Sequence, residues 1–337
     1  MRRLTVLILC LAVATGAIAA DATPKTPHTA MIKFQRDLVN VLALRAEAEP
    51  LLGAALLTQT LPDPPDYISY HALLTRAAGT ADAGPAVTWA QLVDCNHQAR
   101  ACPNAKALAR LEKQAPDNAA TWLMALGQAA RNNDDEAARQ ALNRAAAASR
   151  YDDYHGITLK ALAMAARALP PPATLYQGEQ AAANSAAGVR ALLVFGLGSL
   201  QPMPGFQSAA RICKDAKDDA ATRATCLRLA KTLTWGSSPL ARSLGLHLKA
   251  TLANDAATRE QAKAATRDLV WQVHNFGQLT LKTRHDPELA RALLKRARAG
   301  GTRMSLTLAA LRAAHIPVHA PAGWQPGGKS TSAPTSG

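Results

Sequence analysis

The residues best suited to chemistry lie together in one short segment, RYDDYHG, which runs from Arg150 to Gly156. It combines carboxylates, phenols and an imidazole, groups that serve as general acids and bases or bind metals and sugars. One hypothesis is therefore a hydrolase-like site. We favour the structural alternative, in which an aspartate before a helix caps its first backbone N–H groups. The candidate side chains are Tyr151, Asp152, Asp153, Tyr154 and His155.

A second candidate is the segment DCNHQARACPN, in which His97 lies between Cys95 and Cys102. These residues supply three ligands where a structural zinc takes four, and their spacing is not that of a C-x-x-C redox centre, so we expect neither. Outside the first 20 residues the chain has four cysteines, an even number that favours two disulfides in an exported protein. Of the three pairings, we predict Cys95 with Cys102 and Cys213 with Cys226, each across a turn between helices.

Several enzyme motifs are absent from the sequence. It contains no H-E-x-x-H metalloprotease motif, no G-x-S-x-G nucleophile elbow and no dinucleotide-binding fingerprint. We therefore predict no cofactor and no metal, and an enzyme is the second of our two functional hypotheses.

The N-terminus has the order of a secretory signal. Two arginines precede an apolar run from Leu4 to about Gly16, and small residues follow as far as Ala20. A lipoprotein is the alternative, but Leu9 stands before Cys10, where a lipid-modified cysteine follows a small residue. No later segment reaches the roughly 20 continuous apolar residues of a membrane helix. We expect an exported bacterial protein, periplasmic or extracellular, with no transmembrane segment.

The composition predicts an all-helical fold. Hydrophobic residues make up 48% of the chain, but aromatic residues only 4%, and alanine accounts for 75 of 337 positions. Alanine is the strongest helix former, and it is small enough to let helix axes approach closely. The length exceeds what one core supports, so two domains or an elongated array is expected.

The positive charge is concentrated in the second half of the chain. The formal charge is +14, or +12 without the two arginines of the signal, and residues 21–200 balance to zero, so the whole +12 follows residue 200. Such asymmetry indicates an anionic envelope surface or an acidic protein, although a solvated basic face would look the same. Sparse aromatic residues argue against single-stranded nucleic acid. The densest group comprises Arg291, Lys295, Arg296 and Arg298, part of which the helix dipole explains.

A repeat emerges between residues 66 and 150. Leu74, Leu108 and Leu142 are each 34 residues apart, which is the period of the tetratricopeptide helix-turn-helix unit. Other residues recur with the same or nearly the same spacing. Arg76, Arg110 and Arg144 are also 34 residues apart, and Trp89 and Trp122 are 33 residues apart.

The segment NAATWLMALGQAARNNDDEAARQALNRAAA, residues 118–147, resembles one tetratricopeptide unit. Leu126 and Gly127 stand where that family has its Leu-Gly pair, and Ala138, Leu142 and Ala145 give the small-large-small pattern of its second helix. The resemblance implies an α-solenoid of stacked antiparallel helical hairpins, with a concave groove that binds a protein or peptide. Trp89 and Trp122 are candidate groove residues. The whole chain also resembles uncharacterised secreted bacterial proteins rich in alanine and helix, which implies no activity.

These features predict the organisation of the chain. We expect a signal peptide at 1–20, a helical repeat region at 21–170, a basic helical region at 171–320 and a disordered tail at 321–337. The boundary is the LPPP segment at 169–172. The leading functional hypothesis is an interaction scaffold of the bacterial envelope whose basic C-terminal half meets an anionic partner. The alternative is an envelope enzyme that uses Tyr151, Asp152, Asp153 and His155.

Overall fold

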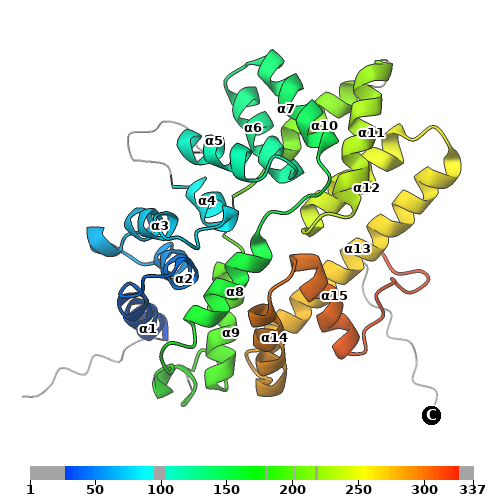
Figure 1. Ribbon diagram of the computed structural model, residues 1–337. Helices are drawn as coiled ribbons and strands as arrows, with labels where there is room; N and C mark the ends of the chain where they lie inside the picture. Colours follow the sequence, from blue (N-terminus) through cyan, green and yellow to red (C-terminus); the bar gives the residue numbers. More distant parts are fainter. Residues whose placement is uncertain (1–26, 95–103, 180, 201, 217–218, 326–337) are drawn as a thin grey trace, which may run out of the picture.

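The computed structural model describes residues 27–94, 104–179, 181–200, 202–216 and 219–325, and within these ranges the protein is all-helical, as predicted (Figure 1). The described residues form no strand, only one isolated bridge between Asn118 and Arg150. Two short 3-10 helices are η1 (Asp66–Ile68) and η2 (Ala173–Leu175).

The α-helices are α1 (Pro27–Leu42), α2 (Ala48–Thr58), α3 (Tyr70–Ala78), α4 (Pro85–Gln91), α5 (Ala105–Gln114), α6 (Ala119–Arg131), α7 (Asp135–Ala147), α8 (His155–Ala165), α9 (Ala186–Leu197), α10 (Phe206–Asp215), α11 (Ala220–Thr234), α12 (Pro239–Leu252), α13 (Ala256–Lys282), α14 (Pro287–Ala299) and α15 (Arg303–Ala313).

Most helix starts are fixed by local sequence. Ten of the described α-helices follow a Ser, Thr, Asn or Asp whose side-chain oxygen accepts a hydrogen bond from a backbone N–H of the first turn. The start of α14 is an example that the sequence predicts, because Asp286 accepts from the Leu289 amide at 2.9 Å and Pro287 occupies the first turn. Gly300, with φ of 77°, ends the same helix.

Two hydrophobic cores hold the helices together. The first core combines α1, α2 and α3 with α8, α9 and α14, and the second combines α5 to α7 with α10, α11 and α12. α4 contributes residues to both. Each core therefore takes residues from both sides of the LPPP segment at 169–172. Smaller clusters lie along α13.

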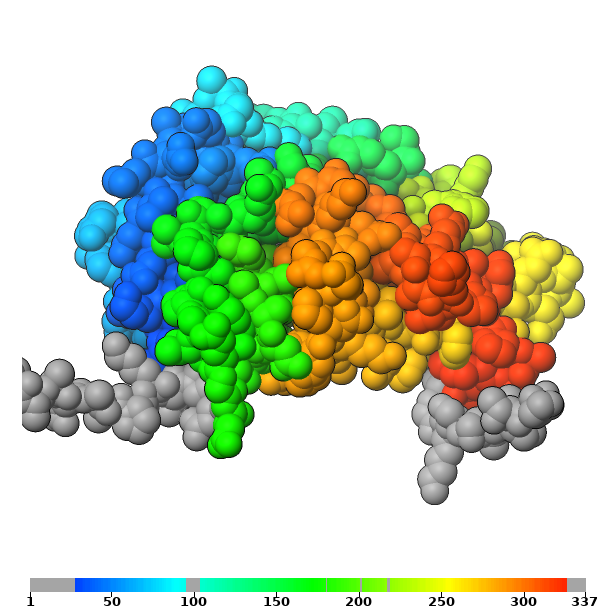
Figure 2. Space-filling model, turned by 90° about the horizontal axis from the view of Figure 1, so that it is seen from below, coloured from blue at the N-terminus to red at the C-terminus, as the bar shows by residue number. Residues whose placement is uncertain are grey.

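The late helices return to the early ones. Figure 1 shows the helices following a curve from α1 through α7 and α11 to α13, after which α14 and α15 turn back towards α8 and α9. α8 also packs on α2, so the beginning, middle and end of the chain meet. The three segments lie side by side on one face in Figure 2, where α1 is blue, α8 and α9 are green and α14 is orange.

This meeting depends on a close approach of two backbones. A Cβ atom added to Gly156, at the start of α8, would lie 1.6 Å from the carbonyl oxygen of Gly301, just beyond α14. Gly301 itself has φ of 103°, in the left-handed region that favours glycine. Two glycines thus allow α8 and the turn after α14 to touch.

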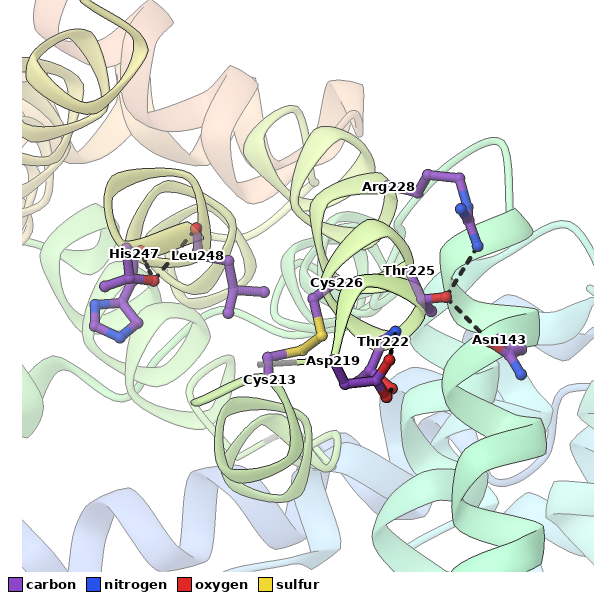
Figure 3. Close-up of a disulfide and its surroundings, with 10 residues drawn as sticks. Asn143, Cys213, Asp219, Thr222, Thr225, Cys226, Arg228, His247 and Leu248 are labelled. Carbon is purple, nitrogen blue, oxygen red and sulfur yellow. Dashed lines mark hydrogen bonds between the residues drawn. A yellow bond between two sulfur atoms is a disulfide. The ribbon is translucent and has the colours of Figure 1, made fainter. Parts of the chain in front are cut away.

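The predicted disulfide between Cys213 and Cys226 is confirmed (Figure 3). It joins α10 to α11, and both cysteines are fully buried in the second core. Beside it, the Thr225 hydroxyl accepts from Arg228 at 3.0 Å and donates to Asn143 of α7 at 3.3 Å. The other predicted pair, Cys95 with Cys102, lies outside the described residues, as does His97.

The chain beyond α15 packs along α13. The Trp271 indole donates to the Pro317 carbonyl at 2.8 Å, and the rings of Trp271 and Trp324 meet edge to face with centroids 5.3 Å apart. Residues 326–337 of the expected tail lie outside the described ranges. Among the helices that the structure describes, none combines the length and apolar composition needed to cross a bilayer.

We expect Gly156→Ala to lower the free energy of unfolding by about 3 kcal/mol or more, because the new methyl group collides with backbone that cannot rotate away. Gly196→Ala in α9 is the matched control, since a Cβ there meets no atom within 4 Å, and it should stabilise by about 0.5–1 kcal/mol through helix propensity. Urea unfolding of both variants measures the difference. Equal stability of the two would contradict the close approach.

Replacing both Cys213 and Cys226 with alanine should lower the free energy of unfolding by about 3 kcal/mol, because the bond restricts a short loop of the unfolded chain. Unfolding of the wild-type protein with and without dithiothreitol separates the covalent effect from lost packing. Native protein should resist reduction, since both sulfurs are buried. Free thiols at these positions, found by alkylation and mass spectrometry of the non-reduced protein, would refute the pairing.

Candidate functional site

A groove lies between α5, α6 and α7, and most of its lining belongs to residues 118–147, the segment that resembles a tetratricopeptide unit. Its volume is about 330 Å³ and one side is open to solvent. Alanines of α6 and α7 form the floor, and polar side chains form the rim. The polar and aromatic lining residues are Glu112, Trp122, Gln128, Asn132, Asp134, Gln140 and Arg144.

Trp122 and Arg144 form one wall of the groove. The Trp122 indole N–H donates to the Pro116 carbonyl at 2.7 Å, which fixes the ring, and the Arg144 guanidinium lies 4.6 Å from the ring centroid. Such a cation–π contact contributes on the order of 0.5–1 kcal/mol at an exposed site. Partial burial raises the pKa of the neighbouring Glu112, and the positive charge of Arg144 opposes that shift. The wall therefore presents one fixed aromatic ring and one positive charge.

Two carboxamides also line the groove. Gln128 and Asn132 are four residues apart on α6 and at its C-terminal end, so they lie on the same face. Neither side chain makes a hydrogen bond to another described residue. A carboxamide offers both a donor and an acceptor, the pair of groups that an extended peptide backbone requires. The sequence analysis did not identify these two residues. Their i, i+4 spacing just before the turn between α6 and α7 could have indicated a shared polar face.

The RYDDYHG segment crosses from α7 to α8 and is tied to its surroundings. Asp152 accepts the backbone N–H of Tyr154 at 2.9 Å. Asp153 accepts the Ser237 hydroxyl at 2.9 Å and the backbone N–H of His155 at 3.4 Å. Both carboxylates therefore serve local backbone and the start of α12. Burial raises the pKa of Asp152, and its hydrogen bond from Tyr154 opposes the rise.

The aromatic side chains of this region point in different directions. Tyr151 is buried against Phe206 of α10, with ring centroids 6.0 Å apart. Tyr154 is buried against Trp89 of α4, at 5.7 Å, and adopts φ of 54°. Trp89 is fully buried, so it offers no surface to a partner in this conformation. The rings of Trp89, Tyr154 and Trp122 all belong to the second core, and Trp122, which is 7% exposed, also lines the groove.

His155 lies apart from the two aspartate side chains, in the wall of a different cavity that also contains Arg303. Its side chain is almost completely buried. Burial, with a smaller contribution from Arg303, lowers the pKa of His155 to about 3. The imidazole is therefore neutral at physiological pH. Across the described ranges, no group of three His, Cys, Asp or Glu residues is placed to hold a metal ion.

Two of the four basic residues predicted on α14 already make contacts within that helix. Arg291 pairs with Glu288 on the same helix, and Arg296 donates to the Ala292 carbonyl at 3.1 Å. Lys295 is exposed and Arg298 is half-buried, and neither makes an ion pair or hydrogen bond with a described residue. Burial lowers the pKa of Arg298, and the positive charge of Arg167 adds to that effect.

Trp235 lies at the end of α11 and is 77% exposed. The letters G-x-x-x-x-G-K-S of a phosphate-binding loop occur from Gly323 to Ser330, but the described residues before them form no strand. Most of that stretch lies outside the described ranges.

The His155 ring should remain neutral far below pH 6.5, the ordinary value for histidine. Because the unfolded chain takes up the proton first, stability is complete above pH 6.5 and falls as the pH drops towards 3, by up to roughly 5 kcal/mol. NMR titration of the ring, against a peptide of residues 150–160, measures the shift. Because glutamine does not titrate, His155→Gln should make the free energy of unfolding fall less steeply as the pH drops below 6.5. A ring that titrates as in the peptide would contradict its burial.

Comparisons with protein-family models, with curated proteins and with solved structures found no match to this chain. The functional proposal accordingly depends on the geometry of its own residues.

Proposed function

We propose that this protein is an exported helical-repeat scaffold of the bacterial envelope, which binds a peptide segment of another protein in the groove between α5, α6 and α7. Export is supported by the signal-like residues 1–20 and by the disulfide between Cys213 and Cys226, since such bonds persist in oxidising compartments.

The repeat proposal is supported by how the 34-residue spacing maps onto helices. Leu74, Leu108 and Leu142 fall on α3, α5 and α7 and are all buried. The arginines two positions later in each helix are all exposed; they are Arg76, Arg110 and Arg144. Residues with the same spacing therefore have the same environment, as repeated units of one architecture would.

The observation that carries the binding proposal is the set of unused polar groups in the groove. Gln128 and Asn132 have free carboxamides in the groove that the Trp122 ring and the Arg144 cation also line. A peptide in this groove would hydrogen-bond to the carboxamides through its backbone and place a carboxylate near Arg144. The alanines of the lining let a peptide backbone approach α6 and α7 closely, most closely where the peptide has a small residue.

The basic C-terminal region is the second part of the proposal. Lys295 and Arg298 lie on one face of α14, and Arg167 and Arg190 lie nearby at the end of α8 and in α9. The Arg190 guanidinium donates to the carbonyls of Ala166 and Leu169, so it is already used in ending α8. The remaining cations favour an anionic envelope surface or an acidic protein. The enzyme alternative gains no support, because both aspartates of its cluster are hydrogen-bonded to backbone and Ser237.

Selection of short random peptides on the immobilised wild-type protein tests the groove. We expect selected peptides with a small residue and a carboxylate, and Arg144→Ala should weaken their binding about tenfold, the effect of losing a charge-assisted contact. Arg139→Ala is the matched control, because it removes the same charge from the same helix outside the groove. Fluorescence anisotropy gives both affinities. Peptides that bind both variants equally would rule out this groove.

A further inference from the structure

We propose that the cavity between α8, α9, α13 and α15 is a binding site for a small monocarboxylate with an apolar body, held by Arg303 and His155. The cavity has a volume of about 170 Å³. It is separate from the groove of the proposed function, and the two proposals stand or fall independently.

The walls of the cavity are mainly apolar. Phe195 and Phe276 meet edge to face with ring centroids 6.3 Å apart. Leu159, Val273 and Leu306 are further apolar residues of the lining. A dry cavity of about 150 Å³ is large enough for benzene. The ligand is therefore the size of a single ring or a short branched chain. The exposed lining residue Ser199 marks the opening to solvent.

His155 is a buried polar group without a protein partner. Its side chain lines the cavity and the residue is only 7% exposed, yet neither ring nitrogen bonds to a described residue. Both ring nitrogens remain accessible to water, so water or a ligand can supply the hydrogen bonds that no described residue makes. Because the ring is neutral, it offers one N–H donor and one acceptor.

Arg303 occupies an unusual position for a cation. It is the first residue of α15, where the helix dipole disfavours positive charge. It is half-buried and forms no ion pair with any described carboxylate. Its charge also acts on the neighbouring His155 ring. An anion between the two side chains would neutralise the guanidinium and accept the imidazole N–H.

The hydroxyl groups of the lining favour an anion held by these two residues. Ser199, Thr280 and Thr307 each donate to a backbone carbonyl of their own helical segment. Their protons are therefore already used, and Arg303 and His155 supply the side-chain donors left in the described lining. A single carboxylate, with two acceptor oxygens, matches two donors.

Benzoate is the probe for this site, with benzamide as its neutral counterpart and inorganic phosphate as an anion without an apolar body. Isothermal titration calorimetry of the full chain should show benzoate binding at least tenfold more tightly than either control. Arg303→Gln should abolish this preference, whereas Arg312→Gln, an exposed arginine on the same helix, should retain it. Ring signals of His155 should shift on addition of benzoate.

A second variant, Gly277→Leu, tests the cavity without changing Arg303. A Cβ added to the cavity-lining Gly277 meets no atom within 4 Å, so Gly277→Leu has room to fill the cavity and should block benzoate without lowering the melting temperature. Equal binding of benzoate and benzamide, benzoate binding that survives Gly277→Leu, or no binding at millimolar benzoate would overturn the proposal. None of these results would bear on peptide binding between α5 and α7.

Discussion

One buried side chain, that of Asn118, connects the two halves of this architecture. Its carboxamide oxygen accepts the backbone N–H groups of Ala120 and Asp152, at 3.1 and 2.9 Å. Its nitrogen donates to the Asp152 carbonyl at 2.7 Å and to the Tyr154 hydroxyl at 3.2 Å. Every hydrogen-bonding position of the amide is thus used. The same residue caps α6 in the second core and fixes the segment that leads into α8 of the first core.

The position of both candidate sites follows from this connection. α7, which carries Arg144 into the groove, ends just before the fixed segment, and α8, which carries His155 into the cavity, begins just after it. A shift of the segment would move one wall of each site. Tyr154 adopts a left-handed backbone conformation here, and burial of its ring against Trp89 offsets the conformational cost. The residues that look most chemical in the sequence therefore position two sites rather than form one.

Sequence reasoning succeeded where the determinants are local and failed where they are distant. Helix starts such as that at Asp286 depend on a few neighbouring residues, and the pair Cys213 and Cys226 spans one hairpin, so both were predictable. The cores were not, because the contact of Gly156 with Gly301 joins residues far apart in the chain and leaves no periodic pattern. The cavity depends on the same return of the chain, which brings Arg303 to His155. Trp89 and Trp122 look equivalent in the sequence, but distant residues give them different surroundings, because Tyr154 packs against Trp89 and Arg144 lies over Trp122.

The net charge of the second half overstates its capacity to bind anions. Several of its arginines donate to backbone carbonyls near helix ends, among them Arg242 to Gly236, Arg259 to Ala253 and Arg284 to Ala182. These guanidinium groups pair with backbone carbonyls in the connections next to helices, so their charge has a structural role. What remains for a partner is the smaller set without such bonds. Lys295 and Arg298 are in that set on the surface of α14, where long-range attraction to a polyanion is screened by salt. Arg303 is also in it, but it faces an apolar cavity, where low polarity strengthens attraction to a single anion.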